Sequence, residues 1–175
     1  KRINKASDDP AGIHRVMRLN AEIQGIKTAS RNAADGQSLI DTLDASLSEV
    51  QSILLRMREL TVQAISDTNS ASDRAALDLE ISQLELEITR IGGTTSFGGK
   101  LIFDGNTHYL QIGPRSGDTL EVQAYTLSAS TLGLNQDLTT RTNAETYLGA
   151  IDTAITDISE KRSAAGALSN RLDFI

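Results

Sequence analysis

The sequence predicts a mainly α-helical protein, an elongated antiparallel bundle of a long N-terminal helix, a second helix and a C-terminal helix, with a small β-hairpin insert. Apolar residues recur at alternating spacings of three and four over much of the 175 residues, the period of a helix with one buried face. Aromatic residues make up only 3% of the chain and Trp is absent, which is typical of rods built from Leu, Ile and Ala. A period of two, typical of strands, occurs only in one short stretch after residue 94.

A long first helix is predicted from Pro10 to Ser66. An Asp of the pair Asp8-Asp9 can cap the free amides, and Pro at the first helical position loses no useful donor. Unbroken, this helix would measure roughly 85 Å at about 1.5 Å per residue. Gly25 and Asp35-Gly36 are the favoured places for a bend, because Gly costs about 1 kcal/mol relative to Ala in a helix interior. The predicted packing seam consists of Ile26, Ala29, Ala33, Gly36, Ile40, Leu43, Leu47, Val50, Leu54 and Met57.

The second helix is predicted to follow a tight turn. Turn-forming residues occupy 67–70, and Ser70 with Asp73 three residues later forms a capping box. A short connection implies that the second helix runs antiparallel to the first, and Gly92-Gly93 is expected to end it. Its predicted seam is Leu77, Ile81, Leu84, Ile88 and Ile91.

A β-hairpin is predicted next, from the alternation of apolar and polar residues over 109–112 and 120–124. Leu110 and Ile112 share one face of the first strand, and Leu120 and Val122 share one face of the second. The six residues 113–118 would form the connecting loop.

The third helix is predicted to start at a capping box formed by Thr142 and Glu145 and to run to Ile175. The chain is therefore expected to be a single domain, with a helical hairpin at 1–93, a β-hairpin region at 94–134 and a C-terminal helix at 135–175.

Composition argues against several classes of partner. Asp and Glu outnumber Lys and Arg by 23 to 17, and this net charge of −6 disfavours nucleic acid. No run of about 18 apolar residues is present, so no membrane span is expected. Cys is absent, which excludes disulfides, thiolate catalysis and sulfur-ligated metals.

No catalytic, cofactor-binding or metal-binding residues are predicted. His14 and His108 lie in different segments and lack the spacing of a zinc site, so ordinary surface roles are expected. Glu85 and Glu87 point in different directions around a helix, which argues against a catalytic pair of acids. Gly92-Gly93 and Gly98-Gly99 come after a predicted helix, whereas phosphate-binding glycines precede one, so these pairs are interpreted as turns.

Several distinctive blocks occur in order along nearly the whole chain: "RINKASDDPAG", "ASRNAADGQSLIDTLDASLSEVQSILLRMRELTVQAISDTNSASDRAAL", "TTSFGGKLIFDG", "LQIG" and "IDTAITDISEKRSAAGALSNRLDFI". Together they resemble bacterial flagellin. The resemblance implies a structural subunit, without catalytic activity, that polymerises helically into the bacterial flagellar filament. It also implies extracellular location after export by the flagellar type III route without a cleaved signal.

The resemblance further implies that the chain is a rod domain alone, lacking the terminal polymerisation segments and any outer variable domain. Such a form is expected to be monomeric, whereas the full-length protein would form a homopolymer with other flagellin subunits. The export chaperone, the cap and the junction proteins are the further partners it implies.

Two sets of surface residues follow from the resemblance. One matches the region that the animal Toll-like receptor for flagellin recognises, with Leu55 in place of a common Gln. These receptor-recognition candidates are Leu55, Arg56, Arg58, Glu59, Leu60, Gln63 and Glu80. The second set consists of subunit-packing candidates, Asp67, Asp73 and Arg74.

Two alternatives remain open. A hook-filament junction protein shares the rod architecture and also has the "SDDP" block, although Arg58-Glu59-Leu60 and Asn170-Arg171 favour flagellin. A coiled-coil adaptor would explain the helical period but not the ordered blocks or the hairpin. An enzyme would require an inserted outer domain, for which the connection from Ala124 to Arg141 leaves no room.

Overall fold

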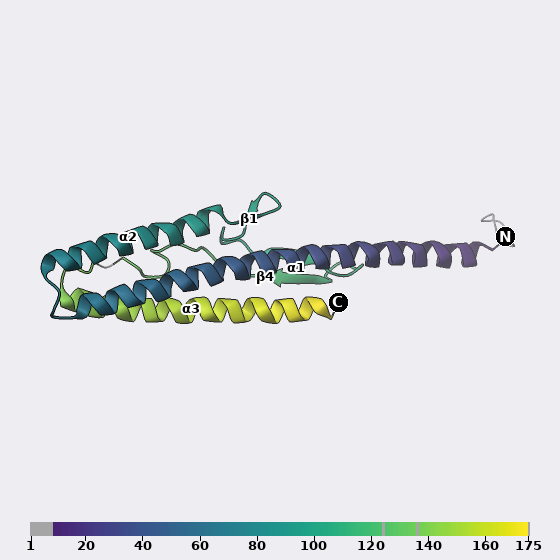
Figure 1. Cartoon of the computed structure of the whole chain (residues 1–175). Coiled ribbons are helices and arrows are strands. Elements are labelled where there is room, and N and C mark those ends of the chain that lie inside the picture. The colour runs from purple at the N-terminus through teal and green to yellow at the C-terminus, as the bar shows by residue number, and fades with distance from the viewer. Residues whose placement is uncertain (1–8, 124, 136, 175) are drawn as a thin grey trace.

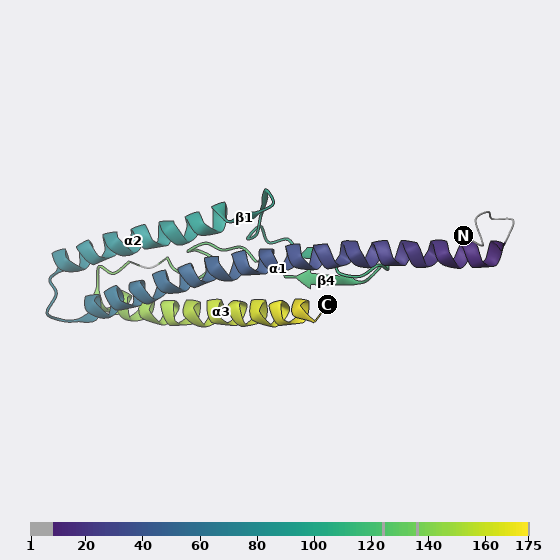
Figure 2. The same ribbon diagram turned by 45° about the vertical axis from the view of Figure 1, so that its right-hand side comes forward.

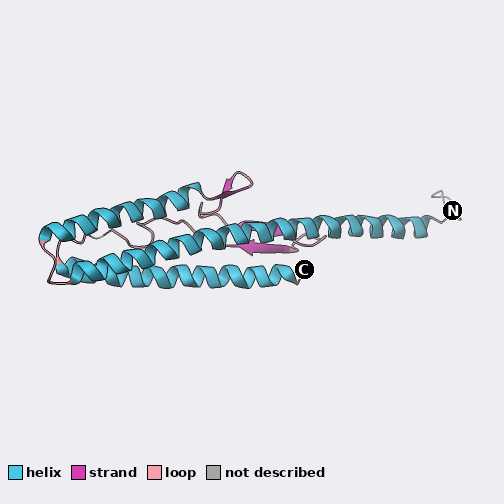
Figure 3. Ribbon diagram, in the orientation of Figure 1, coloured by secondary structure: helices cyan, strands magenta, loops and turns pink. Residues whose placement is uncertain are grey.

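The computed structural model describes residues 9–123, 125–135 and 137–174, and it confirms a mainly helical, elongated bundle. The three helices in this part of the chain are α1 (Pro10–Ile65), α2 (Ala71–Thr94) and α3 (Arg141–Asp173). Helix α1 runs between α2 and α3, and both run antiparallel to it (Figures 1 and 2). The strands lie beside the middle of α1 and beyond the end of α2 (Figure 3).

Helix α1 begins where the sequence predicts. The Asp9 side chain accepts a hydrogen bond from the Gly12 amide at 2.9 Å, which satisfies one of the free donors of the first turn. The helix continues without a break across Gly25 and Gly36. A Cβ on Gly36 would lie 2.5 Å from Leu110 Cδ1, and one on Gly25 would lie 2.8 Å from Pro114 Cβ. Both glycines therefore let the β3–β4 hairpin approach the helix closely.

Helix α2 starts at the predicted capping box. Ser70 Oγ accepts from the Asp73 amide at 3.2 Å, and Asp73 Oδ2 accepts from the Ser70 amide at 2.9 Å. The predicted end at Gly92-Gly93 is wrong, because the helix continues to Thr94. Gly92 is buried inside the helix, where a Cβ would lie 1.9 Å from the Leu127 carbonyl oxygen. It is a contact residue for the 127 segment and not a helix stop.

The predicted hairpin is present with slightly different bounds. Strand β3 (His108–Gln111) pairs antiparallel with β4 (Thr119–Val122), and Leu110 lies opposite Leu120. The loop includes Ile112, whose amide donates to Asp118 O at 2.9 Å. Ala124, in the predicted second strand, lies outside the described residues.

A second, very short hairpin was not predicted. Strand β1 (Ser96–Phe97) pairs with β2 (Lys100–Leu101) across Gly98 and Gly99. Both glycines have positive φ, at 58° and 80°, which a tight turn permits and other residues rarely adopt.

The start of α3 corrects the predicted cap. Thr140 has extended backbone and its side chain accepts from the Asn143 amide at 3.2 Å, so Thr140 caps the helix. Thr142 lies inside the first turn, and Glu145 instead pairs with Arg141 at 2.9 Å. The helix extends to Asp173, and Ile175, its predicted last residue, lies outside the described residues.

One apolar core runs along α1, with contributions from α2, α3, β3, β4 and the segments at 102–103 and 127–138. Leu47, Val50, Leu54 and Met57 have no exposed surface, which confirms the central part of the predicted seam. Ile26, by contrast, is 53% exposed, because the first turns of α1 extend beyond the C-terminal end of α3 (Figure 1). Other large apolar residues exposed on this extension are Val16, Met17, Leu19 and Ile23.

Candidate interaction surface

An ion pair joins α1 to α2 at the centre of the predicted recognition surface. Arg56 donates to Glu80 Oε1 through Nη2 at 2.7 Å and through Nε at 3.1 Å. A third bond runs from Nη1 to Glu59 on the same helix at 3.3 Å. The hydrogen bond with Glu80 is the main cause of a raised pKa for Arg56. About half of the Arg56 and Glu80 side chains is exposed, so the pair is both structural and accessible.

The neighbouring apolar residues have different environments. Leu55 is 49% exposed on the outer surface of α1. Leu60 is only 2% exposed and packs in the core. It can stabilise the helix packing beneath the surface residues, but it offers little area for contact with a partner. Gln63 is exposed at the side chain, while its carbonyl oxygen accepts from Asn69 Nδ2 at 2.5 Å.

Arg58 lies on a different edge of α1 from Arg56. Its Nε donates to Asp152 Oδ1 on α3 at 2.8 Å. The seven candidates on α1 and α2 therefore do not form one patch, since Arg56, Glu59 and Glu80 adjoin the α1–α2 seam and Arg58 adjoins the α1–α3 seam.

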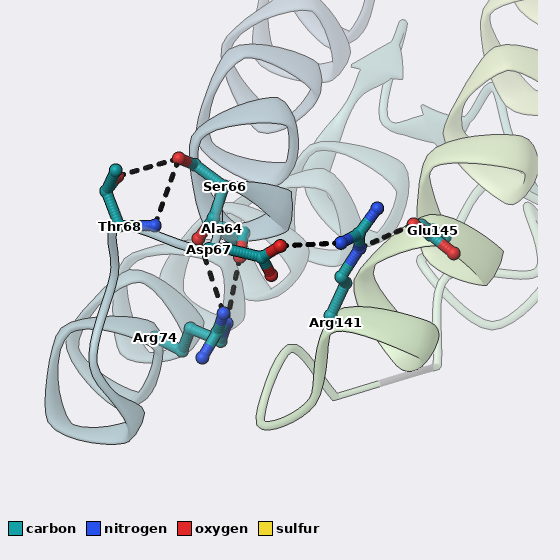
Figure 4. Close-up of polar contacts among 7 residues, drawn as sticks. All are labelled: Ala64, Ser66, Asp67, Thr68, Arg74, Arg141 and Glu145. Carbon is teal, nitrogen blue, oxygen red and sulfur yellow. Dashed lines mark hydrogen bonds and ion pairs between the residues drawn. The ribbon is translucent and has the colours of Figure 1, made fainter.

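The three subunit-packing candidates lie in the α1–α2 turn and the first turn of α2, and Figure 4 shows two of them, Asp67 and Arg74. Arg74 donates to the carbonyl oxygens of Ala64 at 3.0 Å and Ser66 at 3.3 Å, at the C-terminal end of α1, where a cation is favourable. Asp67 accepts from Arg141 of α3 at 2.7 Å. Asp73 is occupied by the cap of α2, and its hydrogen bonds with Ser70 lower its pKa.

Sequence reasoning missed two polar links between helices. The hydroxyl of Tyr147, a residue with no exposed surface, donates to Glu85 of α2. Arg162 of α3 donates to Asp44 Oδ1 at 2.8 Å and to Gln51 Oε1 at 2.7 Å, both on α1. Neither link has a signal in a single sequence, because each joins positions 62 or more residues apart.

The described residues offer little for chemistry. They contain no group of three or more His, Cys, Asp or Glu residues that could hold a metal ion. His14 is exposed, whereas His108 is partly buried with Nε2 3.7 Å from Asp104 Oδ1, so the predicted surface role holds only for the first. Within the described segments, no helix combines the length and apolar character needed to cross a membrane. The arrangement is suited to contacts along a rod.

Comparison with known proteins agrees with this geometry. The family model described as the bacterial flagellin N-terminal helical region matches residues 1–108. Flagellin of Halalkalibacterium halodurans is 43% identical over 98% of this chain and 65% of its own length. Flagellin of Salmonella typhimurium is 39% identical over 94% of this chain and 35% of its own length. The chain thus spans less than two thirds of the length of these curated relatives.

Solved structures show the same fold. The crystal structure of Bacillus cereus flagellin superposes with a TM-score of 0.75 at 39% identity and covers 82% of this chain and 85% of that one. A putative flagellar hook-associated protein from Vibrio parahaemolyticus superposes with a TM-score of 0.78 over 97% of this chain and 92% of that one. At 16% identity, that second likeness concerns the fold alone. With the family model matching most of its length, the chain belongs to the bacterial flagellin family.

Proposed function

We propose that this chain is the rod part of a structural subunit that polymerises helically into a bacterial flagellar filament and has no catalytic role. The observation that carries the proposal is the seam of α1, which runs on past the end of α3. Val16, Leu19, Ile23 and Ile26 are all about half exposed and continue the three-four spacing of the buried seam. Such a stripe favours burial against further helices, as an assembled filament would supply.

A complementation experiment tests this function. The chain would replace the corresponding region of the Halalkalibacterium halodurans flagellin, and the chimera would be expressed in a flagellin-deficient strain of that bacterium. Restored filaments under the electron microscope and restored swimming are expected. A chimera that is exported but forms no filament would contradict the proposal.

Complementation of a second strain, which lacks the hook-filament junction protein, distinguishes a filament subunit from a junction protein. A junction protein would restore motility to a strain lacking that junction protein and not to one lacking flagellin. The 43% identity to a flagellin favours restored motility in the flagellin-deficient strain, the result expected of a filament subunit. Extracellular location, type III export, and contact with the export chaperone, cap and junction proteins all belong to this proposal.

The isolated chain is expected to sediment as a monomer, because exposed ion pairs contribute only about 0–1 kcal/mol each.

We also propose that the α1–α2 surface is recognised by the host Toll-like receptor for flagellin. Arg56, Glu59 and Glu80 offer charged groups that are about half or more exposed, next to the apolar Leu55. Buried Leu60 would act by supporting the helix packing beneath them.

A receptor reporter assay tests recognition. Arg56→Ala should lower the response strongly, whereas Arg90→Ala, which removes an equally exposed Arg paired within α2, should leave it unchanged. Equal responses from the native chain and Arg56→Ala would reject the idea. Circular dichroism of each variant serves as the check on folding.

A further inference from the structure

A hollow lies between α1, α3 and the end of β4, outside both sets of predicted surface residues. Its volume is about 350 Å³, which falls within the usual range of small-molecule sites, about 300–1,000 Å³. The floor belongs to the apolar core, since Leu43, Val122 and Ala165 are at most 4% exposed. Gln123 and Ala164 also line the hollow and are exposed, so it opens to solvent.

Tyr125 provides a polar group in the wall of this hollow. Its ring packs against Phe103, with 5.5 Å between the ring centroids, and Lys161 Nζ lies 4.9 Å from the Tyr125 centroid. The Tyr125 hydroxyl is buried and has no hydrogen-bond partner among the described residues. A buried hydroxyl without a partner is destabilising, and native structures contain few of them. Burial and the carboxylates of Asp157 and Asp44 raise the pKa of Tyr125, which favours the protonated, donating hydroxyl.

The charged groups near Tyr125 are already matched in pairs. Lys161 Nζ pairs with Asp157, and Arg162 Nε pairs with Asp44 Oδ1 at 2.8 Å. A charged ligand would have to displace one of these partners or lie unpaired against the apolar floor, and burying an unpaired charge is costly. The hollow therefore favours a neutral ligand.

We propose that the hollow binds a neutral small molecule with an apolar body and one hydrogen-bond acceptor, such as a ketone or an ester. The body lies against Leu43, Val122 and Ala165, and the acceptor bonds to the Tyr125 hydroxyl. Because this hydroxyl is covered in the free chain, the ring must turn slightly towards the hollow on binding. At roughly 30 Å³ for each non-hydrogen atom, the hollow has room for about ten of them.

Ordered water is the competing occupant. A water molecule can accept from the Tyr125 hydroxyl, but a buried water usually makes about three hydrogen bonds, and the apolar floor offers it no further partner. An apolar body gains instead from removing its own surface and that of the floor from water. The mainly apolar lining thus favours an organic ligand over water alone.

Three probes of nearly equal shape separate these contributions. Acetophenone is neutral and has one carbonyl acceptor, cumene lacks the acceptor, and benzoate carries a negative charge. Each is titrated into the ¹⁵N-labelled chain while the amide NMR shifts are followed. Acetophenone should bind saturably and shift amides around the hollow. It should bind about fivefold more tightly than cumene, the factor that corresponds to about 1 kcal/mol for one hydrogen bond, and benzoate should not bind.

Three variants locate the site. Ala165→Leu fills the hollow from its floor and should abolish binding of both neutral probes. Ala167→Leu, at an exposed position of the same helix, should leave binding unchanged. Tyr125→Phe keeps the ring but removes the donor, so it should bind acetophenone only as tightly as cumene. Circular dichroism of each variant verifies the fold.

Several results would overturn the inference. One is acetophenone binding that survives Ala165→Leu, and another is equal binding of acetophenone by the native chain and Tyr125→Phe. Benzoate that binds as tightly as acetophenone would reject the neutral ligand. A hollow that holds water alone would give no saturable shift with any probe on the native chain. The titrations use the isolated chain, so their outcome is independent of filament formation.

Discussion

The hydroxyl of Tyr147 on α3 donates a hydrogen bond to the carboxylate of Glu85 on α2, a second polar link to α2 besides the Arg56–Glu80 pair. Burial raises the pKa of Tyr147 above its usual value, which favours the protonated hydroxyl that donates this hydrogen bond. Burial also raises the pKa of Glu85, and the nearby Asp78 carboxylate adds to that effect.

Removing this donor should destabilise the bundle. Tyr147→Phe leaves a partly buried carboxylate without its partner, and we expect a loss of about 1–3 kcal/mol in the free energy of unfolding. Urea denaturation measures the loss. Tyr109→Phe, at a position 64% exposed, is the matched control and should change stability by less than about 0.5 kcal/mol.

The raised pKa of Glu85 gives a second prediction, on pH dependence. A carboxyl whose pKa is higher in the folded state stabilises the fold most below its ordinary value of 4.5 and loses that stabilisation as pH rises through the raised value. Glu85→Gln should therefore gain stability relative to the native chain at neutral pH, and this gain should shrink in acid. Unfolding curves of both proteins at several pH values measure the difference. A difference that is constant with pH would contradict the assignment.

Gly92 should tolerate no side chain. Because a Cβ there would lie 1.9 Å from the rigid carbonyl oxygen of Leu127, Gly92→Ala must displace the 127 segment. We expect a loss of about 1–3 kcal/mol or more. Gly93→Ala has no atom within 4 Å of the new Cβ and should stabilise the helix by up to about 1 kcal/mol. Thermal unfolding of the two variants should move their midpoints in opposite directions.

A hollow of about 350 Å³ between α1, α3 and the β4 segment offers a site for stabilisation. Ala165 lines it and is only 4% exposed. Ala165→Leu should fill part of the hollow and raise the free energy of unfolding by up to about 2 kcal/mol, at about 0.8 kcal/mol per buried methylene. Ala167→Leu, at an exposed position, should give no comparable gain in chemical denaturation.

The Arg56–Glu80 pair should contribute little to stability. With both side chains about half exposed, a double-mutant cycle with Arg56→Ala and Glu80→Ala should give a coupling energy below about 1 kcal/mol, and less at high salt. A coupling energy several times larger would show that the pair is a major stabilising contact between α1 and α2. A lower receptor response to Arg56→Ala would then reflect unfolding of the variant.

Helical period and local capping made most of the fold predictable. The seam from Ala29 to Met57 and the box at Ser70 and Asp73 depend on residues a few positions apart, which a single sequence displays. Gly92 shows where that reasoning fails. A glycine near a helix end usually marks the end of the helix. Here glycine is required because the backbone of Leu127, 35 residues later, packs directly against Gly92.

The candidate surface was harder to predict than the fold. Sequence pattern placed Arg56 and Glu80 on neighbouring helices, and the structure gives their bond. It could not reveal that Leu60 faces the core or that Asp67 is held by Arg141, 74 residues away. Contacts between distant segments depend on the rotation of each helix about its axis, which spacing alone leaves undetermined.

Helix α1 contacts α2, α3 and β3 and has no break between Pro10 and Ile65. A force applied along the rod would therefore be transmitted by one uninterrupted ladder of backbone hydrogen bonds, with the outer elements clamped to its sides. The continuous backbone of α1 would therefore resist stretching of the protein. The contacts that join α2, α3 and the β3–β4 hairpin to α1 would be the first to separate under load.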